Sequence, residues 1–392
     1  MTPAARVQAA IELLDQVIAG ARDKGAPADR LIAAYFKTRR YAGSKDRRAV
    51  RELVYRAVRH CGEVPPSGRA AMLALAESDP ALGPLFDGSA HGPAPRREDE
   101  PVAQAGLAPG WLVEALEASG IAGEAAGALL GRAPLDVRVN ALKASRAAID
   151  LPEQGEPLAA TQGLRFPTGT NAEQWPAYAD GLIEVQDHGS QLVCEAIPGK
   201  PGETVIDLCA GAGGKTLALA ARFGNALTLV AADTDKRRLG NLAPRAARAG
   251  AEIAHTVLLD PGREMEALGS YEGRADHVLV DAPCSGSGTW RRNPESRWRL
   301  DPDELARLGR LQDHVLDLAA RLVRRGGTLT FVTCSLLDAE GADRFAAFLA
   351  RNARFAPERP AMALGEPRGE GIRLDPYRHD TDGFFIAIAR CA

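Results

Sequence analysis

The chain has 392 residues, of which 45% are hydrophobic and 25% are charged, and its formal net charge is −3. This length suggests two or three domains, and no apolar run reaches the roughly 18 residues of a membrane-spanning helix. The N-terminus lacks the apolar stretch of a signal peptide, so we expect a cytoplasmic protein. The six cysteines are scattered and include no C-x-x-C pair, which argues against disulfides and bound metal.

The first part of the chain, residues 1–87, is predicted to be an all-helical domain. Val7, Leu14 and Val17 recur at helical spacing, and a similar apolar series follows between Val50 and Val58. Residues 1–62 contain 13 lysines and arginines against 6 acidic residues, so this stretch carries +7 while the chain as a whole is negative. The asymmetry favours a polyanionic partner, and an ordinary solvated helix surface is the alternative.

Three further segments follow along the chain. Residues 88–106, rich in glycine and proline, are predicted to be a linker, and residues 107–185 a small mixed α/β domain. Residues 186–392 alternate short apolar runs with helical stretches, which predicts a parallel sheet covered on both faces. The expected strands are 136–143 in the middle domain, then 204–210, 227–233, 255–260, 277–283 and 327–335, with an edge strand at 383–390.

A glycine-rich loop, D-L-C-A-G-A-G-G-K-T at 207–216, joins the first strand of the large sheet to a helix. A phosphate-binding P-loop would need glycine in place of Cys209, and a dinucleotide site would need it in place of Thr216. The third interpretation is an S-adenosylmethionine site, because Asp233 and Asp260 end successive strands, where they could bind the ribose and the adenine. Helix capping is the alternative role for each aspartate. The predicted cofactor-binding residues are Cys209, Ala210, Gly211, Ala212, Gly213, Gly214, Lys215, Asp233, Asp260 and Asp281.

Two cysteines follow the ends of the fourth and fifth strands. Cys284 lies in D-A-P-C-S-G-S-G at 281–288, and Cys334 lies in T-C-S-L at 333–336. The carboxyl ends of parallel strands meet at one edge, so both thiols are predicted to lie beside the cofactor loop. Two buried structural thiols are the alternative. The residues alone leave open which thiol would attack a substrate.

These motifs resemble the RsmB/Sun family of RNA (cytosine-5) methyltransferases. The resemblance extends to V-R-V-N-A-L-K at 137–143, V-Q-D-H-G-S-Q at 185–191, R-R-N-P-E-S-R-W at 291–298 and D-G-F-F at 382–385. The helical N-terminal segment is similar to the NusB-like RNA-binding domain of one branch. The resemblance implies a Rossmann-like class I methyltransferase domain that uses S-adenosylmethionine. It also implies an RNA substrate, which the branch suggests to be 16S ribosomal RNA.

The resemblance also assigns roles within the site. Cys334 would add to cytosine carbon 6, Cys284 would assist product release, and Asp281 would bind the cytosine edge. Addition of a thiolate at carbon 6 activates carbon 5 for methylation, and Lys215 is a candidate, by position, for the cation that favours the thiolate. The family commonly has Asp-Glu-Ala where this chain has Asp187-His188-Gly189. We therefore expect His188 to be a surface residue without a role.

RNA contacts are expected at two places. Arginine for phosphate and an aromatic ring for stacking suit single-stranded RNA, although a charged surface loop with a buried tryptophan is the alternative. A DNA or protein methyltransferase and a non-catalytic RNA-binding assembly factor are the rival functions. We expect a monomer with no membrane partner. The predicted RNA-binding residues are Arg291, Arg292, Arg297 and Trp298 after the catalytic loop, and Arg39 and Arg40 in the N-terminal basic patch.

Overall fold

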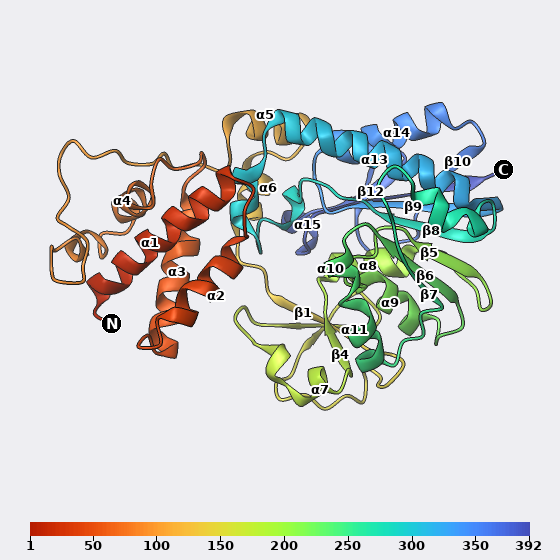
Figure 1. Cartoon of the computed structure of the whole chain (residues 1–392), viewed down its shortest axis with the longest axis horizontal. Coiled ribbons are helices and arrows are strands. Elements are labelled where there is room, and N and C mark those ends of the chain that lie inside the picture. The colour runs from red at the N-terminus through yellow and green to blue at the C-terminus, as the bar shows by residue number, and fades with distance from the viewer. The chain divides into compact units, whose positions relative to one another are not determined.

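The computed structural model describes all residues from Met1 to Ala392, and the chain divides into two compact units (Figure 1). Unit 1 comprises Met1–Gly131 and Thr289–Pro302, and unit 2 comprises Arg132–Gly288 and Asp303–Ala392. The division differs from the predicted boundaries, because the expected linker and the helices after it belong with the N-terminal helices. None of the helices combines the length and the apolar character needed to span a membrane.

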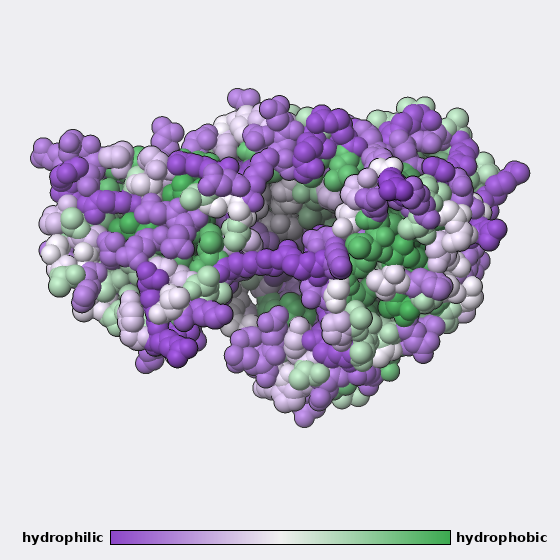
Figure 2. Space-filling model, in the orientation of Figure 1, coloured by the Kyte–Doolittle hydropathy of each residue, from purple (hydrophilic) through white to green (hydrophobic).

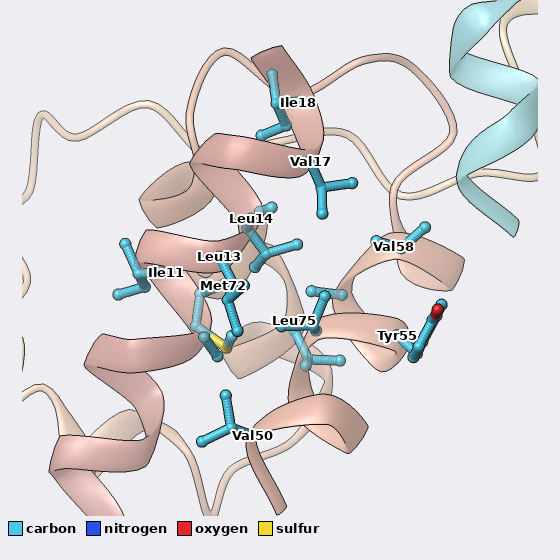
Figure 3. Close-up of a cluster of buried hydrophobic side chains, with 14 of the residues drawn as sticks. Ile11, Leu13, Leu14, Val17, Ile18, Val50, Tyr55, Val58, Met72 and Leu75 are labelled. Atoms are coloured by element: carbon cyan, nitrogen blue, oxygen red, sulfur yellow. The ribbon is translucent and has the colours of Figure 1, made fainter. Parts of the chain in front are cut away.

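Unit 1 is built almost entirely of helices, as its periodicity predicts. Its core contains Leu14 and Val17 of the first helix, Val50 and Val58 of the third, and Leu75 of the fourth (Figure 3). Charged and polar residues cover most of its visible face (Figure 2). The helices are α1 (Pro3–Arg22), α2 (Ala28–Thr38), α3 (Ser44–His60), α4 (Gly68–Ser78), α5 (Gly110–Ala118) and α6 (Gly123–Gly127), with short 3-10 turns η1 (Gly83–Leu85) and η2 (Ala128–Leu130).

The expected linker, residues 88–106, packs against these helices. Glu100 accepts hydrogen bonds from the Arg69 guanidinium at 2.9 Å, and the Ala103 amide donates to the Ala70 carbonyl at 3.2 Å. Glycine and proline keep this segment out of regular structure. Its hydrogen bonds nevertheless hold it on unit 1, so it is an ordered irregular segment and not a free spacer.

The segment Thr289–Pro302 returns to unit 1 from a distant part of the sequence, and it contains the 3-10 helix η6 (Pro294–Arg299). Arg297 on this helix is fully buried. Its guanidinium donates to the carbonyl oxygens of Val58 at 2.6 Å and Cys61 at 2.8 Å, and to that of Pro294. Burial lowers the pKa of Arg297 to about 10, so the side chain remains cationic at neutral pH. Arg297 therefore anchors the segment inside the helical unit.

Replacing Arg297 with alanine is expected to lower the free energy of unfolding of unit 1 by about 3 kcal/mol, because buried carbonyl oxygens would lose a charged donor. Urea unfolding followed by circular dichroism measures this. Arg96→Ala is the matched control, since Arg96 pairs with Glu77 on the surface and should cost less than about 1 kcal/mol. Equal effects of the two substitutions would contradict the anchoring role.

Unit 2 begins with a small antiparallel sheet of strand order β2-β3-β1-β4. Val137 and Val139 of β1 pack with Phe166 and Trp175 in its core. The predicted strand at 136–143 is thereby confirmed, although it ends earlier. The elements are β1 (Leu135–Val139), β2 (Glu156–Pro157), β3 (Gly163–Phe166), η3 (Ala172–Gln174), α7 (Pro176–Ala179) and β4 (Ile183–Val185).

The large sheet of unit 2 has nine strands, in the order β11-β12-β13-β9-β8-β5-β6-β7, with β10 paired to β13. Strands β9, β8, β5, β6 and β7 run parallel, as predicted. The chain moves outward from β5 in one direction through β6 and β7, then continues on the other side with β8 and β9. The strands are β5 (Thr204–Asp207), β6 (Thr228–Asp233), β7 (His255–Leu258), β8 (Ala275–Asp281), β9 (Val323–Thr333), β10 (Phe355–Glu358), β11 (Glu366–Arg368), β12 (Gly371–Leu374) and β13 (Phe384–Cys391).

Helices cover both faces of this sheet. On one face Ile206 and Val280 pack with Leu316 of α13 and Phe345 of α14. On the other face Val205 and Leu279 belong to a second cluster with residues of α8 and α9. The alternation of neighbouring strand residues between two cores explains why these strands are apolar throughout. The helices are α8 (His188–Ala196), α9 (Gly214–Arg222), α10 (Lys236–Leu239), α11 (Leu242–Ala249), α12 (Glu264–Leu268), α13 (Pro302–Leu322), α14 (Ala342–Arg351) and α15 (Pro376–His379), with 3-10 turns η4 (Gly269–Tyr271), η5 (Ser287–Thr289) and η7 (Asp338–Glu340).

The last strand corrects one expectation. We expected residues 383–390 to form an edge strand, but β13 lies inside the sheet between β9 and β12 and runs antiparallel to both. The short strands that flank it come from residues 355–374, whose weak apolar pattern did not reveal them. The nearly complete burial of β13 follows from its interior position.

Candidate active site

The site is built where the strand order reverses. The carboxyl ends of β5 and β8 lie next to each other at the point where the chain changes direction across the sheet. In open α/β sheets this reversal leaves a crevice outside the strand ends, and ligands bind there. The glycine-rich loop follows β5, while Asp281 ends β8 and Cys334 directly follows β9. The fold therefore brings the three predicted motifs to one edge.

The glycine-rich loop turns sharply between β5 and α9. Gly211 has a φ of 54°, and a Cβ atom there would lie 2.4 Å from a guanidinium nitrogen of Arg238. Glycine is needed at this position both for the left-handed backbone and for the close approach of Arg238. The Arg238 guanidinium therefore occupies the space that a larger residue at position 211 would need.

A cavity of about 690 Å³ lies at this edge, within the size range of small-molecule sites. Its lining includes Asp233, Asp235 and Arg238 and the thiols of Cys284 and Cys334. One hydrophobic area is visible on unit 2 among mostly polar surface (Figure 2). Several lining residues carry no sequence motif, because they come from α10, from α13 and from the loop after β7: Arg238, Leu259, Pro261, Leu311, His314, Val315 and Leu318.

The two predicted strand-end aspartates differ in their surroundings. Asp233 is buried, and its carboxylate accepts hydrogen bonds from the backbone amides of Gly211 and Asp235, both at 2.7 Å. It thus shapes the glycine-rich loop as well as lining the cavity. Asp260 lies two residues beyond β7 with 70% of its side chain exposed, and it is not among the lining residues. The predicted adenine contact of Asp260 stays a prediction.

Three ionisable side chains lie at the ends of β5 and β8 and at the start of α9: Asp207, Asp281 and Lys215. The Lys215 ammonium donates to Asp281 at 2.6 Å. Burial lowers the pKa of Lys215, but the Asp281 carboxylate outweighs this, and the net pKa is raised. Burial raises the pKa of Asp207 to about 7, even though the Thr216 hydroxyl donates to it at 2.6 Å. The Oδ1 atom of Asp207 is buried without a hydrogen-bond partner, and Asp207 is not among the residues that line the cavity.

The two thiols lie side by side. The sulfur atoms of Cys284 and Cys334 are 3.3 Å apart, and both residues are free cysteines that are partly exposed. The hydrogen bond to Cys334, together with burial, raises the pKa of the Cys284 thiol well above its ordinary value. Cys284 is therefore protonated at neutral pH and can act as a hydrogen-bond donor. A negative charge on the Cys334 sulfur would interact favourably with the Lys215 ammonium.

The arginines and the tryptophan expected to bind RNA after the catalytic loop belong to unit 1. Arg297 and Trp298 are buried, and the Trp298 indole donates to the Cys61 carbonyl at 3.3 Å. Arg291 is also buried, whereas Arg292 is half-buried. The expectation of RNA contacts from Arg297 and Trp298 is corrected, because their polar groups are turned into the helical core. The alternative of a structural role describes these two residues.

The prediction for His188 was wrong. Only 4% of this residue is exposed, and its Nε2 accepts a hydrogen bond from the Ala160 amide at 3.3 Å. Its own amide donates to Asp136 at 3.0 Å. Burial lowers the pKa of the imidazole, so His188 is neutral at physiological pH. It fastens the start of α8 to the small sheet, a tertiary contact that no local pattern indicates.

The fold and the strand-end site together define a Rossmann-like methyltransferase. The family described as 16S rRNA methyltransferase RsmB/F matches residues 195–390, and the chain belongs to this family. It is 35% identical to the probable ribosomal RNA small subunit methyltransferase B of Synechocystis, over 71% of this chain and 66% of the relative. Identity to the ribosomal RNA small subunit methyltransferase B of Xylella fastidiosa is 34%, over 74% of this chain and 70% of the relative.

A solved structure extends the likeness to the whole chain. The crystal structure of PH0851 matches with a TM-score of 0.74 and 25% identity, covering 100% of this chain and 99% of that one. The sequence matches are shorter, since the chain spans between 59% and 66% of the length of several curated relatives. The family and the fold follow from these comparisons, while the activity and substrate are inferred from the site.

Proposed function

We propose that this protein methylates carbon 5 of a cytosine in RNA, with 16S ribosomal RNA as the substrate and S-adenosylmethionine as the methyl donor. The observation that carries the proposal is the pair of thiols 3.3 Å apart at the cofactor edge of the sheet. Transfer to an oxygen or to an exocyclic nitrogen would need no thiol. Carbon 5 of cytosine is a weak nucleophile, and a covalent thiol adduct overcomes that weakness.

The cavity fits the methyl donor, which when bound supplies an electrophilic methyl group. Asp233 in the lining could accept hydrogen bonds from the ribose hydroxyls, and Arg238 could pair with the carboxylate of the methyl donor. Leu311, Val315 and Leu318 of α13 are apolar lining residues against which an adenine ring could pack. Asp260 is not among the residues that line the cavity, so a contact with the adenine amino group would come from beyond that lining.

The side chains support an addition and elimination sequence. The Cys334 thiolate forms a bond to carbon 6, and the electron pair of the 5,6 double bond moves toward N3. Asp281, held by Lys215, would accept a hydrogen bond from the exocyclic amine of the cytosine edge, and the Lys215 cation beside it would offset the charge that gathers at N3. After methylation of carbon 5, a water molecule or another base takes the carbon 5 proton, the electron pair of that C–H bond restores the 5,6 double bond, and Cys334 leaves with the electron pair of its bond to carbon 6. Cys284 is protonated and adjacent, so its S–H group can donate a hydrogen bond to the departing sulfur.

The direct test uses the purified full chain, 16S ribosomal RNA and a methyl-labelled donor. We expect label in the RNA and a cytosine that resists bisulfite conversion. Labelled RNA without any protected cytosine would refute carbon 5 as the acceptor. The rival assembly-factor function predicts no binding of S-adenosylhomocysteine, and calorimetry separates the two because the enzyme should bind it.

The N-terminal basic patch is proposed to hold single-stranded RNA. Arg39 already lies over the Tyr35 ring at 3.6 Å and bonds to Glu12, so it is only partly available. Arg40 is exposed, and the neighbouring ring of Tyr41 is 73% exposed. Exposed cations beside an exposed aromatic ring suit a phosphate backbone with an unstacked base. Lys45 and Arg48 are also exposed and extend this patch.

Replacing Arg40, Lys45 and Arg48 with alanine should weaken RNA binding and flatten its dependence on salt. Each lost phosphate contact lowers the slope of log affinity against log salt by about 0.7 for single strands. Alanine at Arg321, Arg324 and Arg325 is the matched control, because it removes the same charge at the amino end of β9, away from the cavity. A slope that changes equally in both triple variants would refute a specific role for the patch.

A further inference from the structure

Glu340 lies immediately behind the two thiol loops. It ends the 3-10 helix η7 (Asp338–Glu340), and its side chain is completely buried. All of its hydrogen-bond donors are neutral: the Ser285 amide at 2.9 Å, the Ser285 hydroxyl and the Gln312 amide group at 3.1 Å. A carboxyl group buried among neutral donors is costly to desolvate. Stability alone therefore does not explain why a carboxyl group occupies this position.

The hydrogen bonds of Glu340 reach both sides of Cys284. Ser285, which follows the cysteine, donates its amide and its hydroxyl to Glu340. Gln312 of α13 donates both to Glu340 and to the carbonyl of Pro283, which precedes the cysteine, at 2.9 Å. The backbone on either side of Cys284 is thus fixed through one carboxyl group.

The same network continues to the second thiol. The Ser335 hydroxyl lies 3.2 Å from that of Ser285 and 3.0 Å from that of Ser287, and Ser335 directly follows Cys334. The Gly288 amide also donates to the Cys334 carbonyl at 3.0 Å. Glu340 comes from the chain just after Cys334 and grips the loop that carries Cys284. It therefore ties together two loops that are 50 residues apart in sequence.

We propose that Glu340 is a positioning residue that sets the distance between Cys284 and Cys334 and keeps their roles, release and attack, distinct. It acts through Ser285, Ser335 and Gln312 and touches neither substrate nor cofactor. The inference rests on the proposed two-thiol chemistry. The charge of Glu340 acts together with its hydrogen bonds. The hydrogen bond to Cys334 and burial raise the pKa of Cys284 most, and the negative charges of Cys334 and Glu340 raise it further. Glu340 thus helps to keep Cys284 as the proton-bearing thiol.

The first test is Glu340→Gln, which retains the shape but turns one acceptor into a donor facing other donors. The probe is iodoacetamide, applied to the full chain over a pH series, with mass spectrometry of each cysteine peptide. We expect the midpoint for Cys284 alkylation to move to lower pH, while that of Cys209, a thiol of the same cavity, stays unchanged. The matched control is Glu370→Gln at an exposed position, which should shift neither. Unchanged Cys284 midpoints in Glu340→Gln would overturn the proposal.

The second measurement follows turnover with RNA. Glu340→Gln should lower kcat by about 100-fold, because misplacement of reacting groups by about 1 Å costs that much, while S-adenosylhomocysteine affinity stays the same. If Glu340→Gln fails to fold, Ser285→Ala breaks the same link to Ser335 and should also lower kcat with unchanged cofactor affinity. Wild-type turnover in the folded variant would overturn the positioning role. If Glu340→Gln shifts the Cys284 midpoint but the wild-type chain methylates no RNA, the proposed function alone is refuted.

Discussion

Replacing Cys334 with alanine is expected to abolish methyl transfer and every covalent adduct with RNA. Without the thiol, carbon 5 of cytosine has no route to the activated form, so the rate should fall by roughly 10⁴-fold or more. The cavity is lined by many other residues, so cofactor affinity should change little. Methyl transfer from labelled donor and calorimetry with S-adenosylhomocysteine measure the two quantities separately.

The control for Cys334 is Cys391→Ala, which removes a buried thiol at the end of β13. This variant should keep its activity, because β13 runs antiparallel to β9 and ends at the edge of the sheet opposite the cavity. Full activity in Cys334→Ala would remove this residue as the nucleophile. An adduct that persists in Cys334→Ala would instead point to Cys284 as the attacking thiol.

Replacing Cys284 with alanine is expected to have the opposite signature, an accumulated protein–RNA adduct. Cys334 can still add to carbon 6, but its departure loses the neighbouring S–H donor that stabilises the leaving thiolate. The adduct should appear as a slower band on a denaturing gel, and steady-state turnover should fall at the same time. The adduct should also carry the methyl group, since only the release step is affected.

The double variant Cys284→Ala/Cys334→Ala is the matched control for this gel. It should give no slower band, because no attacking thiol remains. Turnover at the wild-type rate in Cys284→Ala, with no adduct, would rule out the release role. The pair of single variants therefore separates attack from release, which the 3.3 Å sulfur distance alone does not.

The sequence by itself identified most of the fold of unit 2. Short apolar runs and a glycine-rich loop are local signals, and parallel strands bring their carboxyl ends to one edge whatever the rest of the chain does. Asp233, Asp281, Cys284 and Cys334 could therefore be placed together without coordinates. The family resemblance added the roles of the two thiols, which strand positions alone leave equivalent.

Only the tertiary structure decided features that depend on distant partners. The local sequence around Arg297 and Trp298 predicts an exposed RNA-binding segment. In the folded chain both side chains are buried in the core of unit 1. His188 lacks any local signal for burial, and β13 is interior because strands of weak pattern pair beyond it. Such contacts are set by packing between segments far apart in sequence, which periodicity cannot report.

The same distinction applies to the site. The sequence was enough to predict two thiols at one edge of a sheet, because strand ends and residue identities are local properties. Their separation and the protonated state of Cys284 depend on side-chain hydrogen bonds across 50 residues of sequence. The bracing by Glu340 likewise arises only when the loops after β8 and β9 fold against each other. The sequence thus determines which residues reach the site, while the distance between the two sulfur atoms and the protonation of Cys284 depend on how the chain packs.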